Sequence, residues 1–165
     1  MKLAASFAFI AVALLLPLAA QSQQEPGRPS QPVQPDPAAE SVKMRQGLMA
    51  AVRWQFAPIA AFARDRSAEL TPELVGRIRF LANLAEIAPQ GFVEPSADVE
   101  GSNALPAVWE QREEFARLMH NFQAETARLA ELAAAGQGNE VRGHFARVAE
   151  TCSACHETFR REMPR

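Results

Sequence analysis

Apolar residues recur at three- and four-residue spacing along four stretches of the chain, which is the spacing of amphipathic helices. The stretches run from about 40 to 66, from 72 to 88, from 106 to 135 and from about 139 towards the C-terminus. None of them alternates apolar and polar residues as a half-buried strand does. Four such helices, joined mostly by short turns, predict an all-α domain folded as an antiparallel four-helix bundle.

One charged residue interrupts the apolar face of the first predicted helix. Arg45 lies between Val42 and Met49 on that face. A charge inside an apolar stripe is costly unless it is paired. Either the Arg45 side chain reaches water at the helix end, or it reaches an anionic group inside the bundle. The other apolar positions of this face are Val52, Phe56, Ile59 and Ala63.

Prolines predict where the helices bend and end. Pro58 lies well inside the first helix, where it removes a backbone hydrogen bond and should produce a kink. Pro89 ends the second helix, and the third predicted helix opens at Pro106. The connection between them is the one long loop, and we expect its apolar residues Phe92 and Val93 to turn inward.

The N-terminal residues have the composition of an exported protein. Residues 1–20 combine Lys2, a long apolar run and small residues before Gln21, which is the pattern of a secretory signal peptide. The run is too short to span a membrane comfortably and has no flanking cluster of charges. Residues 21–38 are rich in Gln, Pro and Ser, so we expect a disordered tether. Residues 39–165 are then the bundle domain.

The charge of the chain argues against two classes of partner. The formal net charge is −2 at pH 7. This mild acidity gives no reason to expect nucleic acid or an anionic membrane surface as a partner. After cleavage of the predicted signal, we also expect no insertion into a membrane.

The strongest chemical signal is the C-x-x-C-H sequence of residues 152–156, which is the attachment motif of c-type haem. Two thiols add across the two vinyl groups of one porphyrin edge, and the adjacent imidazole binds the iron. On a helix, Cys152, Cys155 and His156 are at positions i, i+3 and i+4, so they project from one face. We therefore expect one haem c, attached through two thioethers, with His156 as the iron ligand.

The same two cysteines could form a disulfide, a dithiol redox motif or half of a metal site. A zinc site would need further Cys ligands or a well-spaced His, and none follows. A redox C-x-x-C usually opens a helix after a strand, whereas this motif closes a helical C-terminus. The export signal favours haem, because c-type haem is attached in the bacterial periplasm. We therefore expect a periplasmic protein.

With these features the chain resembles the class II c-type cytochromes, and specifically the cytochrome c′ family. The segment from Cys152 to Arg160 is similar to the family's closing motif, which includes an Arg one turn beyond the haem His. Residues 42–49 are similar to the first-helix motif, and residues 106–109 to the Pro-x-x-Trp opening of the third helix. The resemblance covers essentially the whole domain and implies a four-helix bundle with a haem inside one end.

The resemblance also implies roles for individual residues. It makes His156 the proximal iron ligand and Arg160 a cation beside it. It makes Arg45 the partner of a haem propionate and Met49 the side chain over the distal haem face. Most members leave the sixth iron position empty behind a bulky apolar residue, whereas low-spin relatives fill it with a first-helix Met. We expect Met49 to pack over an empty position, because it follows Arg45 by four residues.

The function that the resemblance implies is a periplasmic haem protein with five-coordinate iron that binds nitric oxide and carbon monoxide. The family also suggests electron transfer with a redox partner protein, and dimers formed through the first two helices. The alternative is a low-spin one-electron carrier with Met49 as sixth ligand, and His120 and His144 are further candidates for that position. A peroxidase would need a distal acid–base group. We expect only apolar residues there on the first helix, and therefore no enzymatic activity.

Overall fold

The computed structural model describes residues 34–93 and 95–162. The predicted signal peptide and residues 21–33 of the predicted tether lie outside them. The described chain is helical, and one isolated bridge between Ala104 and Arg160 is its only β-type pairing. None of the described helices is long and apolar enough to cross a membrane.

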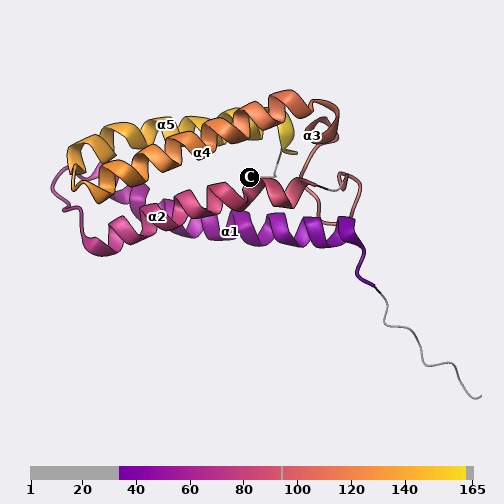
Figure 1. The fold of residues 1–165 in the computed structure, drawn as a ribbon, viewed down its shortest axis with the longest axis horizontal. Helices are drawn as coiled ribbons and strands as arrows, with labels where there is room; N and C mark the ends of the chain where they lie inside the picture. Colours follow the sequence, from indigo (N-terminus) through magenta and orange to yellow (C-terminus); the bar gives the residue numbers. More distant parts are fainter. Residues whose placement is uncertain (1–33, 94, 163–165) are drawn as a thin grey trace, which may run out of the picture. The chain divides into compact units, whose positions relative to one another are not determined.

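Four long helices form the bundle, and the prediction of an all-α four-helix bundle is confirmed (Figure 1). They are α1 (Pro37–Arg64), α2 (Pro72–Ile87), α4 (Arg112–Ala134) and α5 (Gly138–Phe159). Helix α1 packs on α2 and α5, and α4 packs on the same two helices. The connection from α2 to α4 contains a 3₁₀ helix, η1 (Ala88–Phe92), and a short helix, α3 (Ala107–Glu110).

The core contains the apolar faces that the periodicity predicts. Its most deeply buried side chains come from all four long helices and include Ile59, Ile78, Leu81, Leu129, Val141 and Val148. Burying each of these side chains stabilises the fold by about 1.5–3 kcal/mol relative to exposure. Leu48, Phe62 and Leu84 are also buried, although the predicted stripes of the first two helices did not include them.

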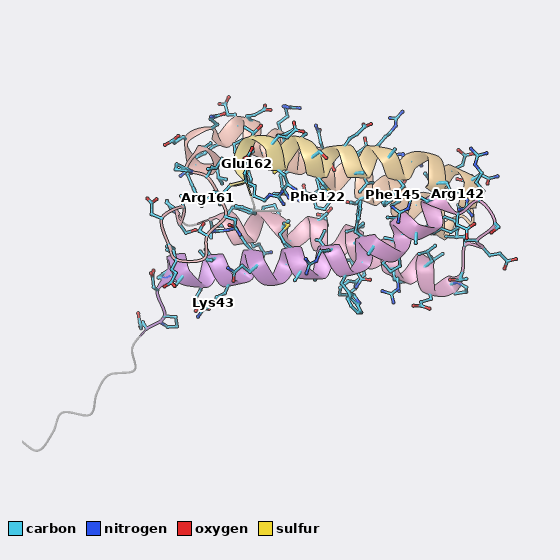
Figure 2. All side chains as sticks on the ribbon, turned by 180° about the vertical axis from the view of Figure 1, so that it is seen from behind. Lys43, Phe122, Arg142, Phe145, Arg161 and Glu162 are labelled. Carbon is cyan, nitrogen blue, oxygen red and sulfur yellow. The ribbon has the colours of Figure 1, made fainter. Side chains whose placement is uncertain are left out.

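Local capping sets the ends of α1. Asp36 is the N-cap, its side chain accepts a hydrogen bond from the Ala38 backbone N–H, and Pro37 occupies the first helical position. The helix therefore begins two residues before the predicted domain boundary, inside the last residues of the predicted tether. It continues through Pro58, and Figure 2 shows that its axis changes direction along its length.

Arg142 of α5 closes the opposite end of the bundle by capping α1 and the turn that follows it. Its guanidinium donates hydrogen bonds to the backbone oxygens of Phe62, Asp65 and Ala68. The same group lies 3.8 Å from the centroid of the Phe62 ring. A cation at the C-terminus of a helix satisfies carbonyls that have no partner within the helix.

The prediction of one continuous third helix from 106 to 135 is wrong, because the helix is broken at Gln111. This residue has φ −112° and ψ 52°, which lie outside the helical region, and it separates α3 from α4. Contacts with distant segments hold α3 in place. The Trp109 indole N–H donates to the Phe92 backbone oxygen at 3.1 Å, and the Leu105 backbone N–H donates to the Phe159 oxygen at 2.9 Å.

The long connection only partly follows the prediction. Helix α2 ends before Pro89, as expected, but the chain continues as the 3₁₀ turn η1, whose first turn accepts a proline. Phe92 packs against the core, and its ring centroid lies 4.8 Å from that of Phe115. Val93 does not turn inward, since 67% of its surface is exposed.

Candidate functional site

A cavity of about 550 Å³ opens between α1, α4 and α5, at the end of the bundle that the long connection covers. Residues 101–104 of that connection and Phe92 complete its wall. Figure 2 shows Phe122 of α4 in the space between α1 and α5. All six residues that the sequence nominated for a site line this one cavity: Arg45, Met49, Cys152, Cys155, His156 and Arg160.

The C-x-x-C-H residues lie in the last two turns of α5, where the helix faces the cavity. Cys152, Cys155 and His156 are half-buried, and both cysteines have free thiols. The disulfide alternative is therefore wrong for this structure. In the described part of the chain, no group of three or more His, Cys, Asp or Glu side chains could hold a metal ion, so a zinc site has no support either.

Burial sets the protonation of these three groups. It raises the pKa of the Cys152 thiol, and burial together with the neighbouring Cys152 raises the pKa of Cys155 to about 11. Both thiols are therefore protonated at neutral pH, whereas a dithiol redox motif needs a lowered thiol pKa. Burial, and then the positive charge of Arg160, lower the pKa of His156. The neutral imidazole is the form that ligates a metal.

Arg45 is a buried cation without a buried anion. Only 6% of its surface is exposed, so the hypothesis that it reaches water at the helix end is wrong. Its Nη1 donates to the Gly91 backbone oxygen and to Ser96 Oγ, both at 2.8 Å, and its Nη2 donates to Ser102 Oγ at 3.1 Å. The rings of Phe92 and Trp109 lie 5.2 and 5.7 Å from its guanidinium carbon.

All of these partners of Arg45 are neutral, and none of the described carboxylates pairs with it. Burial accordingly lowers the pKa of this guanidinium. A guanidinium has five N–H donors, and the described residues accept three hydrogen bonds from it. Two of its N–H donors therefore have no acceptor among the described residues. The arrangement fits the carboxylate of a haem propionate, since a buried charge needs a counter-charge.

Aromatic side chains form much of the remaining wall. The cavity is lined by Phe56, Phe92, Phe115, Phe122 and Phe159. The Phe115 and Phe159 rings meet edge to face with centroids 5.3 Å apart. The sequence placed most of these residues on apolar stripes, but a stripe cannot distinguish a packed core from the wall of a cavity. An apolar wall fits a porphyrin, because it removes a large flat apolar surface from water.

Several other residues of this cavity were not predicted from the sequence. Met119 of α4 is a second methionine in the wall, and Gln46 and Arg53 of α1 lie at the cavity surface. The expectation that the first helix offers only apolar residues there is therefore wrong. Arg53 follows Met49 by four residues, so the spacing that placed Met49 on the site could also have found it.

The two histidines proposed as alternative iron ligands are not part of the cavity wall. His120 is exposed. His144 is half-buried, and its Nε2 lies 2.9 Å from Glu125 Oε2 and 3.1 Å from the backbone oxygen of the same residue. His144 thus joins α5 to α4 outside the site.

The chain is similar to known cytochromes. It matches the family described as "Cytochrome C'" over residues 40–160. A cytochrome c′ of Cereibacter sphaeroides is 31% identical over 127 residues, which are 74% of this chain and 84% of that protein. The structure of cytochrome c prime from Shewanella frigidimarina has a TM-score of 0.70 and 23% identity, and the match covers 78% of this chain and 99% of that chain.

Cytochrome c prime from Alcaligenes xylosoxidans shares the same fold. A ferrous variant with bound nitric oxide has a TM-score of 0.69 and 21% identity, and the match covers 76% of this chain and 97% of that chain. A further variant of that protein was solved with carbon monoxide bound, with a TM-score of 0.68 and 22% identity, and the match again covers 76% and 97% of the two chains.

Proposed function

The chain belongs to the cytochrome c′ family, and from this premise we propose that it is an exported haem protein whose five-coordinate iron binds nitric oxide and carbon monoxide. One observation supports this proposal above the others. Six residues chosen from the sequence, from Arg45 to Arg160, line a single cavity. Two variants of the Alcaligenes xylosoxidans cytochrome c prime, one with bound nitric oxide and one with bound carbon monoxide, share the fold.

The residues of the cavity divide into three roles around the haem. Cys152 and Cys155 would form the two thioethers, and the neutral imidazole of His156 would ligate the iron. Arg45 would neutralise a propionate with its two remaining N–H donors, and Arg160 would keep a positive charge beside His156. The haem supplies an iron with one open position for a ligand.

The chain itself decides what reaches that position. Met49 and the phenylalanines of the cavity wall exclude water, so small neutral molecules enter at the lowest cost. Among the α1 residues that line the cavity, Arg53 is the only charged one besides Arg45, and it is exposed. Because the Arg53 side chain is exposed to solvent, it does not supply a buried distal acid–base group. We therefore propose ligand binding and not peroxidase catalysis.

A second function, one-electron transfer, is favoured by the surface access of the site. Gln46, Arg53 and Arg160 line the cavity and are exposed. A haem in this cavity would therefore have an edge close to the protein surface, where a redox partner could approach. Electron transfer needs no sixth ligand, but a low-spin carrier would use Met49 as one.

We also propose a homodimer through the outer surface of α1 and α2. Trp54 of α1 is 71% exposed and Phe80 of α2 is 50% exposed, and large exposed apolar residues often mark interfaces. Sedimentation velocity of the purified protein tests this. A dimer that becomes a monomer in Trp54→Glu supports it, and a monomeric wild type contradicts it.

Titration of the ferrous protein with carbon monoxide tests the gas-binding function. We expect a saturable spectral change with one gas molecule per haem. The affinity should rise when Met49 is replaced by Ala, because the ligand no longer has to displace the side chain. A ferrous protein whose spectrum does not respond to carbon monoxide would refute gas binding.

A further inference from the structure

The connection between α2 and α4 is attached to α1 through hydrogen bonds from two neighbouring residues. Arg45 bonds to Gly91, Ser96 and Ser102, and Gln46 Nε2 donates to the Gly101 backbone oxygen at 3.0 Å. These partners lie 46 to 57 residues along the chain from Arg45 and Gln46. Residues of the connection therefore hold the Arg45 guanidinium in its position in the cavity wall.

Gly91 also lies directly against the stem of the Arg45 side chain. A Cβ added at this residue would lie 2.7 Å from Arg45 Cγ, 3.5 Å from its backbone N and 3.6 Å from its Cα. Cγ is near the backbone, so the Arg45 side chain cannot avoid such a contact by moving only its tip. Gly91 does not have a positive φ. Its lack of a side chain thus serves the close approach of α1 and not an unusual backbone conformation.

We propose that Gly91 is a positioning residue for the haem site. It leaves the space in which the Arg45 side chain lies and accepts one of the hydrogen bonds that hold the guanidinium in the cavity wall. By fixing the position of the Arg45 guanidinium, the connection would determine where a positive charge lies near the haem. This inference rests on the proposed haem site, because Arg45 acts there as the partner of a propionate.

A substitution at Gly91 should therefore change the midpoint potential of the haem as well as the stability of the fold. A positive charge near the iron favours the ferrous state, because reduction lowers the charge of the centre. If Ala at position 91 displaces the Arg45 guanidinium, the midpoint potential falls. Arg45→Ala should lower it in the same direction.

The experiment is a double-mutant cycle on the haem-loaded protein, read by the midpoint potential. The four proteins are the wild type, Gly91→Ala, Arg45→Ala and the double variant. Covalent haem is measured first in each of them. Gly47→Ala is the matched control, since it lies two residues from Arg45 and an added Cβ there meets nothing within 4 Å.

We expect Gly91→Ala to lower the potential in the wild type and to have no effect in the Arg45→Ala background, where Cγ is absent. Gly47→Ala should leave the potential unchanged. An equal shift in both backgrounds, or none in the wild type, overturns the positioning role while the proposed function stands. A wild type without covalent haem overturns the proposed function and this inference together.

A second variant keeps the test decisive if Gly91→Ala does not fold. Ser102→Ala removes only the hydroxyl that accepts from Arg45 Nη2. Ser102→Ala should lower the midpoint potential by less than Gly91→Ala does. In the Arg45→Ala background it should have no effect. A shift of equal size without Arg45 would show that the connection acts on the haem by another route and would overturn the inference.

Discussion

Replacing Arg45 with Ala should destabilise the protein strongly, although the substitution removes a buried charge from an apolar helix face. The substitution breaks three hydrogen bonds to the α2–α4 connection and removes the cation beside Phe92 and Trp109. It also leaves the Gly91 backbone oxygen without this donor. In the haem-loaded protein a propionate would lose its counter-charge as well.

The magnitude follows from these contacts. A hydrogen bond from a charged donor contributes about 1.5–3 kcal/mol, so three such bonds contribute roughly 5–9 kcal/mol before any offset. Removing the guanidinium also recovers the cost of burying it, which is several kcal/mol for an ion in a protein interior. The net loss should be about 2–4 kcal/mol. For a domain of this size that corresponds to a fall in Tm of roughly 6–16 °C.

Thermal unfolding followed by circular dichroism at the helical signal measures this loss. Arg77→Ala is the control, because Arg77 is 26% exposed, pairs with the exposed Glu73 at 2.9 Å within α2, and donates one hydrogen bond to Gln55 Oε1 of α1 at 3.3 Å. Such an i,i+4 pair contributes about 0.3–0.5 kcal/mol. Similar Tm changes for Arg45→Ala and Arg77→Ala would refute the view that the connection depends on Arg45.

Three further predictions concern the haem attachment, the distal side and the helices. The Cys152→Ser and Cys155→Ser variants should each hold haem less securely, and the double variant should release haem on acid–acetone extraction. If acid–acetone extracts haem from the wild type, the attachment is not of the c type. Met49→Ala should raise carbon monoxide affinity and lower stability in denaturant unfolding by about 1–3 kcal/mol, because this side chain is only half-buried; unchanged affinity would argue against crowding. Gly76→Ala should raise stability by about 0.5–1 kcal/mol, since an added Cβ there meets nothing within 4 Å; a lower Tm would contradict this.

The sequence predicts the four long helices well because each one is encoded locally. Apolar spacing sets the buried faces, whereas the N-cap Asp36 was assigned to the predicted tether, so the start of α1 was placed too late. The break at Gln111 could not be predicted in the same way. It depends on hydrogen bonds from Trp109 to Phe92 and from Leu105 to Phe159, and these partners are far apart in the sequence.

The same distinction between local and distant contacts explains which parts of the site could be predicted. The C-x-x-C-H motif is local, so its three residues could be placed on one face of a helix from spacing alone. The charged residue on the first-helix face was also visible, but its partners Gly91, Ser96 and Ser102 were not. Whether Arg45 reaches water or the interior depends on how the connection folds over α1. Periodicity contains no information about that.

The electronic spectrum of the purified protein, in the ferric and ferrous states without added ligand, shows whether Met49 binds the iron. If haem is attached at Cys152 and Cys155 and Met49 packs over an open iron position without binding it, both oxidation states should be high-spin. The ferrous protein should then show broad, unsplit bands. Sharp, split low-spin bands in the ferrous protein would contradict this expectation and would assign Met49 to the iron of an electron carrier.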